Sequence, residues 1–327
     1  MEYNENKYIY HKETKDLFLD DIKNENTKKA YEVLFAQISK SEQLYTKDIF
    51  DFNIEELKSC LELLQKTTII SVATTVSKIV NYWKWALNPG KFTKNIEPLS
   101  WLMSKKVEDL VSSTALENSY ISEEEMYSII EKEVRNNADA GLILLLYRGV
   151  CGYEMSELIN LETNNINFDN NTIKIIGTVK INKEIIDSSR ILTLSDRDMG
   201  ILKLAVDSKI YIKGEGEDKK IYNFLESPYI FKNFENTKAV EGDKISYSQL
   251  SSRIKTVFKN HYKPQINAQK IIYSAMLNEL QKIKQEKNNL EKEDYIKVLD
   301  SFYKNSSNVK VNTLKKTYNL LLEKGII

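Results

Sequence analysis

The sequence predicts a mainly α-helical protein with a small β-sheet, folded as two domains. Three observations lead to this fold class. The chain has 327 residues, which is more than one domain usually needs. It contains only 10 glycines and 4 prolines, which favours helices over a turn-rich all-β fold. Apolar residues recur at helical spacing over most of the chain, while strand-like runs are confined to a short central region.

The first domain is expected to be a helical bundle over residues 23–102. The polar residues 1–22 are interpreted as an N-terminal arm. Thr27 is expected to cap the first helix, and the last helix of the bundle should stop at 88–90 (NPG). Residues 103–118 are polar and poorly periodic, which predicts a linker between the domains.

The second domain is expected over residues 119–327. It opens with 122–125 (SEEE), a pattern typical of a capping box at a helix start. Short strands are predicted at 166–168, 172–176 and 191–194, and helices dominate the rest of the chain.

Charge is distributed unevenly along the chain, although the formal net charge is zero. Residues 251–327 contain 15 Lys and Arg against 7 Asp and Glu, a local net charge of +8. Residues 1–120 have a net charge of −2, so the middle carries −6. A basic C-terminal third beside an acidic middle predicts an oriented electrostatic surface.

Several classes of protein are excluded by the residue types. No run of eighteen apolar residues exists, and the N-terminus lacks an apolar signal core, so we expect a cytoplasmic protein. Cys60 and Cys151 lie far apart and are expected to be reduced thiols. His11 and His261 are the only histidines, which excludes a His-rich metal site. We expect no metal ion and no cofactor.

Five segments resemble the tyrosine recombinase (phage integrase) family. The first domain contains 27–31 (TKKAY), 81–86 (NYWKWA) and 95–98 (NIEP) in the order that this family shows. The second contains 121–125 (ISEEE) and 152–158 (GYEMSEL), which aligns with the family signature Gly-x-Arg-x-Ser-Glu-Leu. The resemblance implies a helical core-binding domain, a catalytic-like domain and double-stranded DNA as partner.

The resemblance also implies that the catalytic site is degenerate. In this family a tyrosine attacks a DNA phosphate while two arginines neutralise its oxygens. Glu154 occupies the place of the first arginine. Asn267 and Lys270 stand at the ends of the His-x-x-Arg motif, and Asn305 falls at a later histidine position. Tyr318 is the best candidate for the nucleophile, but it shares an apolar helical stripe, so a core role is favoured.

The exchange of arginine for glutamate reverses the sign of a charge that the reaction needs. A pair of unit charges about 4 Å apart is worth roughly 4 kcal/mol at an effective dielectric constant near 20. We therefore expect no recombinase activity, and no catalytic residues are assigned.

DNA contacts are expected from lysines, arginines and hydroxyl groups of both domains, which would embrace the duplex as a clamp. Lys180 and Lys183 lie between the predicted strands, where the family carries a hairpin lysine. The remaining candidates are Thr27, Lys28, Lys29, Thr74, Thr75, Lys78, Arg148, Arg190, Arg253, Lys255, Lys259, Lys263 and Lys270.

Three functions follow from these observations. The first is a sequence-specific repressor that binds operator sites and maintains a prophage in lysogeny. The second is an active, divergent recombinase that uses Tyr318. The third is a protein-interaction module with secondary DNA contact, for which a phage-encoded regulatory protein is the expected partner. The final helix, 311–322, can pack within its own chain or on a neighbouring copy.

Overall fold

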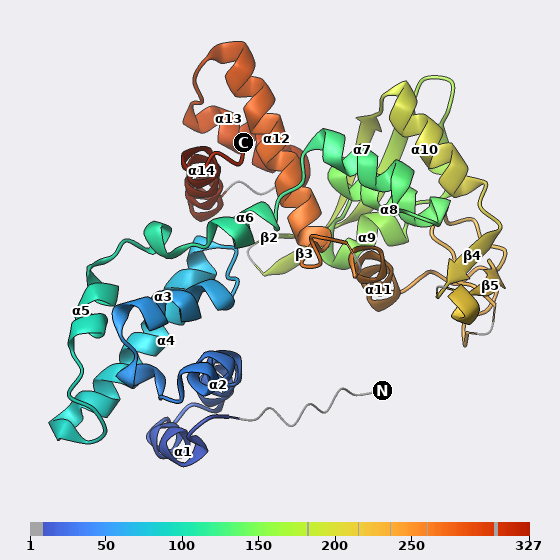
Figure 1. Cartoon of the computed structure of the whole chain (residues 1–327). Helices are drawn as coiled ribbons and strands as arrows, with labels where there is room; N and C mark the ends of the chain where they lie inside the picture. Colours follow the sequence, from blue (N-terminus) through green and yellow to red (C-terminus); the bar gives the residue numbers. More distant parts are fainter. Residues whose placement is uncertain (1–8, 182, 215, 236, 260, 304–306) are drawn as a thin grey trace. The chain divides into compact units, whose positions relative to one another are not determined.

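A computed structural model describes residues 9–327 except 182, 215, 236, 260 and 304–306. The chain divides into two compact units, Met1–Glu117 and Asn118–Ile327, which are called unit 1 and unit 2 and described separately. Figure 1 shows their elements. The predicted fold class, mainly helical with a small sheet in two domains, is confirmed.

The regular elements of unit 1 are all helices among its described residues. Its core surrounds Trp83 and Phe35, both fully buried, and Tyr82, which contacts Phe35 edge-on with ring centroids 4.8 Å apart. The elements are α1 (Lys12–Asp20), α2 (Glu25–Tyr45), η1 (Ile49–Asp51), α3 (Ile54–Leu63), α4 (Ile69–Leu87), η2 (Asn88–Gly90), α5 (Glu97–Ser104), η3 (Val107–Leu110) and α6 (Ser113–Glu117).

The segment predicted as an arm is structured from Lys12 onward. Helix α1 buries Phe18 and Leu19 in the core of unit 1. Lys15 is fully buried, and its ammonium group lies 2.9 Å from both Glu42 and Asp48. Residues 12–20 therefore form a docked helix where an arm was expected. Two apolar residues within a polar segment are enough to anchor one face of a helix.

The predicted start of α2 is corrected by the structure. Asn24 is the N-cap, and its side chain accepts a hydrogen bond of 3.0 Å from the amide of Thr27. Thr27 lies in the first turn and is exposed. The predicted linker also contains regular structure, because η3 packs against α4 and α6 follows it.

Unit 2 is built around α8 (Asn137–Tyr147), a helix buried on all sides. It packs against α7 (Glu123–Lys132), α10 (Asp196–Val206), α11 (Tyr247–Phe258) and α12 (Ala268–Lys287) (Figure 1). The remaining helices are η4 (Tyr153–Met155), α9 (Ser156–Ile159), η5 (Thr163–Asn165), η6 (Gly216–Asp218), α13 (Lys292–Tyr303) and α14 (Asn308–Glu323).

A three-stranded antiparallel sheet has the order β1-β2-β3. Its strands are β1 (Ile166–Asn167), β2 (Thr172–Ile181) and β3 (Glu184–Thr193), and β2 and β3 form a long hairpin in which Thr172 pairs with Thr193. Both hairpin strands are longer than predicted. A second antiparallel pair, β4 (Ile210–Lys213) and β5 (Lys220–Asn223), was not predicted.

The start of α7 confirms one half of the expected capping box. The hydroxyl of Ser122 accepts a hydrogen bond of 3.1 Å from the amide of Glu125. The carboxylate of Glu125 instead contacts the ammonium group of Lys263, at 2.8 Å. Within the part of the chain that the structure describes, no helix is both long and apolar enough to cross a membrane.

Candidate nucleic-acid interface

The segment between α8 and α9 is a tight turn that depends on two glycines. Gly149 and Gly152 have φ angles of +80° and +70°, in the left-handed region. A Cβ atom on Gly152 would lie 2.5 Å from the hydroxyl oxygen of Ser156. Glu154 and Met155 also adopt left-handed conformations, with φ of 50° and 59°. We call residues 149–158 the motif turn.

Glu157 is the buried anchor of the motif turn, with 1% of its surface exposed. Its carboxylate accepts a 2.9 Å hydrogen bond from the amide of Cys151. It also accepts bonds from both terminal nitrogens of Arg190 on β3, of which that from Nη2 is 2.9 Å long. Arg190 Nη2 donates further to the carbonyl of Gly149, at 2.8 Å. Arg190 therefore fastens the hairpin to the motif turn.

A second set of contacts holds β2 to the same turn. The amide of Thr178 donates to the hydroxyl of Ser156 at 2.9 Å. Gly177 passes so close that an added Cβ would lie 2.5 Å from the Cγ of Glu157. Ser156 and Glu157 thus have structural roles, while Glu154 is exposed. The ammonium group of Lys180 stands 5.0 Å from the ring centroid of Tyr153, beside Glu154 in sequence.

Among the other positions that align with catalytic residues of the recombinase family, Asn267 and Tyr318 have structural roles. Asn267 caps α12, because its side chain accepts a 3.1 Å hydrogen bond from the amide of Lys270. Burial lowers the pKa of the half-buried Lys270. Tyr318 is 1% exposed in the core of unit 2, as its apolar stripe predicts. Asn305 lies outside the described residues.

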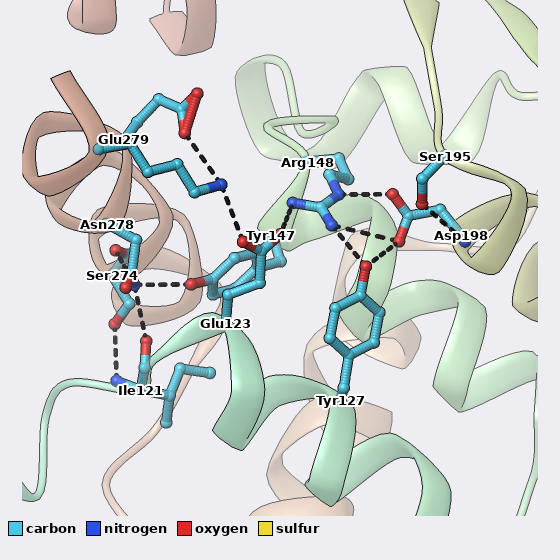
Figure 2. A network of polar contacts seen from close by, with 11 residues as sticks. Ile121, Glu123, Tyr127, Tyr147, Arg148, Ser195, Asp198, Ser274, Asn278 and Glu279 are labelled. Atoms are coloured by element: carbon cyan, nitrogen blue, oxygen red, sulfur yellow. Dashed lines mark hydrogen bonds and ion pairs between the residues drawn. The ribbon is translucent and has the colours of Figure 1, made fainter. Parts of the chain in front are cut away.

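Arg148 was expected to contact DNA, and in the structure intramolecular partners engage all three of its guanidinium nitrogens (Figure 2). Nε donates to Asp198 at 2.8 Å, Nη2 donates to Tyr127 at 2.8 Å, and Nη1 lies 2.6 Å from Glu123. Burial alone would raise the pKa of Asp198, but hydrogen bonds from Arg148 and Tyr127 outweigh it and lower that pKa. Arg148 ties α7 and α10 to the end of α8.

Four further candidates for DNA contact have side chains that are buried or engaged within the protein. Thr75 is only 7% exposed. Arg253 donates through Nε to Asp139 at 2.6 Å and is 5% exposed. Lys263 donates to the carbonyl of Tyr120 at 2.7 Å and is 6% exposed. Arg190 is held by Glu157 as described above.

The remaining candidates present their side chains at the surface of one unit or the other. In unit 1, the ammonium group of Lys78 on α4 donates to the carbonyl of Ala30 on α2, at 3.0 Å. The two helices thus share one surface. Lys28 is part of this surface, and its ammonium group lies 3.6 Å from the carboxylate of Asp20. Thr27, Lys29 and Thr74 of unit 1 are exposed, as are Lys180, Lys183, Lys255 and Lys259 of unit 2.

One basic residue of the α2–α4 surface was missed by the sequence reasoning. Lys66 donates to the side chain of Gln37 on α2, at 2.9 Å. Burial, together with the charge of the nearby Lys78, lowers the pKa of Lys66. It lies in the loop between α3 and α4, where no helical periodicity marks a face, so the sequence carried no signal for it.

The fold and the motif turn define a tyrosine-recombinase-like protein with a core-binding domain and a catalytic-like domain. The sequence matches the family "MrpR, C-terminal catalytic domain" over residues 120–323 and "MrpR, N-terminal core-binding domain" over residues 9–88. The chain therefore belongs to the MrpR family.

Similar proteins include a prophage protein and several recombinases. The SPbeta prophage-derived uncharacterized protein YopR of Bacillus subtilis (strain 168) is 24% identical over 312 residues, covering 90% of this chain and 88% of YopR. XerA recombinase has a TM-score of 0.39 at 13% identity, covering 96% of each chain. The Tn1549 transposon integrase, in complex with a circular intermediate DNA, has a TM-score of 0.38 at 10% identity, covering 96% of this chain and 95% of its own.

Proposed function

We propose that this protein is a sequence-specific double-stranded DNA-binding protein that has lost strand cleavage and represses prophage genes to maintain lysogeny. Its relative YopR is described as prophage-derived, which is consistent with a role in a prophage. The DNA would be held as an operator, without breakage of its backbone.

The observation that carries the proposal is the exposed carboxylate of Glu154 at the place of the family's first arginine. The turn around it keeps the glycine, serine and glutamate of the family signature, Gly152, Ser156 and Glu157, in tightly packed positions. The scaffold is thus retained while the charge at the reacting position is reversed. A carboxylate at this position repels the oxygens of a phosphate group and cannot stabilise the charge that develops during transfer.

The surroundings of Tyr318 support the same conclusion. Its hydroxyl group is buried and has no hydrogen-bond partner among the described residues. Burial raises the pKa of Tyr318, which disfavours the phenolate that attacks a phosphate. Helix α14, which contains Tyr318, packs against α13 of the same chain.

DNA binding itself would use the surface basic groups of both units. In unit 1 these are the exposed Lys29 and the half-buried Lys66 and Lys78 around α2 and α4, and in unit 2 the exposed Lys180 beside Tyr153 and Lys255 on α11. Lysines at the surface neutralise phosphates and release counterions, which gives affinity that depends on salt.

The test is recovery of DNA fragments bound by the protein in its native host, followed by a promoter-reporter assay on those sites. The proposal predicts a small set of prophage operators whose transcription falls when the protein is present. Binding spread evenly over the genome, or bound sites without an effect on transcription, would contradict it.

A further inference from the structure

Two contacts between α2 and the α4 region define how the α2–α4 surface is arranged. Lys78 on α4 donates to the carbonyl of Ala30, near the start of α2, at 3.0 Å. Lys66, which precedes α4, donates to the side chain of Gln37, further along α2, at 2.9 Å. Sequence position therefore rises along α2 where it falls along α4, so the two helices run antiparallel across this surface.

The middle of this surface carries neutral side chains that are open to solvent. Val33 and Gln37 lie one turn apart on α2, and Ile70 and Thr74 lie one turn apart on α4, so each pair projects from one face of its helix. Val33 is 46% exposed and Ile70 is 59% exposed, and Gln37 and Thr74 are also exposed. None of the four is acidic, so a polyanion that approaches them meets no carboxylate at these positions.

Lys66 and Lys78 lie at the two ends of this neutral patch, and their charges are not neutralised. Their partners are the amide oxygen of Gln37, the carbonyl of Ala30 and the ring of Tyr31, whose centroid is 5.8 Å from the ammonium group of Lys78. Among the described residues, neither lysine pairs with a carboxylate. Burial and the charge of Lys78 lower the pKa of Lys66, and an anion such as a DNA phosphate would oppose that effect.

Lys66 also fixes the orientation of the Gln37 amide. An ammonium group has only donors, so the amide oxygen faces Lys66 and the NH₂ group of Gln37 points elsewhere. Because Gln37 is exposed, this NH₂ group can donate to an acceptor outside the protein. Val33, one turn away, places methyl groups near the same donor. In the major groove thymine presents an acceptor, O4, together with a methyl group, whereas cytosine presents a donor and no methyl group.

We propose that the α2–α4 surface reads a thymine of an A·T base pair in the major groove. Gln37 donates through Nε2 to O4 of the base, and Val33 and Ile70 contact its C5-methyl group. Lys66 and Lys78 bind phosphates on either side. The inference rests on the proposed function as a DNA-binding protein, and adds to it the residues that read a base and the base that they read.

The test begins with selection of bound duplexes from a random-sequence DNA library by the full chain. Each thymine of a selected duplex is then replaced in turn by deoxyuridine, which lacks only the methyl group, and affinity is measured by fluorescence polarisation. We expect at least one thymine whose replacement weakens binding roughly fourfold, the contribution of one buried methyl group. That sensitivity should disappear in Val33→Ala or in Ile70→Ala, since these variants remove the side chains that contact the methyl group.

Ile96→Ala is the matched control. Ile96 is 62% exposed, close to the value for Ile70, but it precedes α5 and follows the C-terminal end of α4. The sensitivity to deoxyuridine should remain in this variant. Gln37→Ala should lower the preference for A·T at the same base pair, while Lys66→Ala should weaken binding to all duplexes alike.

Two results would overturn the inference in different ways. If no thymine is sensitive to the loss of its methyl group, or if the sensitivity survives in both Val33→Ala and Ile70→Ala, the base-reading role is wrong although DNA binding stands. If the full chain selects no duplex at all from the library, the proposed function fails together with the inference.

Discussion

Arg190 on β3 and Glu157 in the motif turn form a two-bonded ion pair that connects residues 33 positions apart. The pair fastens the hairpin to the turn, and Gly177 and Ser156 complete the contact. Glu154, three residues before Glu157, has the same side chain and an exposed position. The two glutamates therefore differ in role: Glu157 holds the motif turn together, while Glu154 faces solvent.

Glu157→Gln should destabilise unit 2 by about 2 kcal/mol, because it weakens charge-assisted hydrogen bonds to Arg190 and the Cys151 amide in a buried position. Glu154→Gln is the matched control and should change the free energy of unfolding by less than about 0.5 kcal/mol. Denaturant unfolding monitored by circular dichroism measures both. Equal effects of the two variants would contradict the assignment of Glu157 as the anchor.

Glu154→Arg should raise DNA affinity roughly tenfold at low salt, because repulsion of a phosphate is replaced by attraction. The slope of log affinity against log salt should steepen by about one. Glu235→Arg makes the same charge change beside β5, where Glu235 pairs with Asn223, and should have a smaller effect. If both variants bind equally well, Glu154 does not face the DNA. Neither variant should cleave DNA, since Asn267 and Lys270 are unchanged.

Tyr318→Phe should stabilise the protein by about 1 kcal/mol, because it removes a buried hydroxyl that has no partner among the described residues. DNA affinity should be unchanged. Thermal unfolding and a polarisation titration check the two expectations. A loss of stability of similar size would mean that the hydroxyl group is hydrogen-bonded after all.

Unit 1 should lose stability as the pH rises from about 5 to about 8. Burial raises the pKa of Glu42 to about 8, with Asp48 adding to the rise and Lys15 opposing it. One buried lysine can neutralise only one of these two carboxylates. A group whose folded pKa is raised stabilises the fold below its unfolded pKa, and that stability is lost as the pH passes the folded pKa. Glu42→Gln should flatten the dependence of unfolding free energy on pH, and an unchanged slope would rule out Glu42 as its source.

Affinity for DNA should fall at least tenfold for each doubling of salt concentration if six or more phosphates are neutralised. Lys255→Glu at an exposed position of α11 and Lys78→Glu on α4 should each weaken binding to all sequences. Glu293→Lys on α13 is a control with the opposite change of charge. A polarisation titration measures each, and a flat salt response would contradict a clamp built from phosphate contacts.

The fold class and the motif turn were predictable because both depend on local sequence. Helical spacing marks the bundle, and glycines at 149 and 152 mark a turn that needs positive φ angles. The functions of Arg148 and Arg253 were not predictable. Their carboxylate partners Asp198 and Asp139 lie 50 and 114 residues away, so an arginine that looks free in sequence is neutralised in the fold. The β4–β5 pair was missed for a different reason, because each of its strands is only four residues long.

Retention of DNA binding together with loss of strand cleavage can be tested in one experiment. The protein is incubated with a nicked suicide substrate that carries an operator recovered from the native host, and the products are separated under denaturing conditions. We expect a full shift of the DNA in a native gel and no covalent protein–DNA adduct. A covalent adduct that disappears in Tyr318→Phe would contradict it and identify an active recombinase.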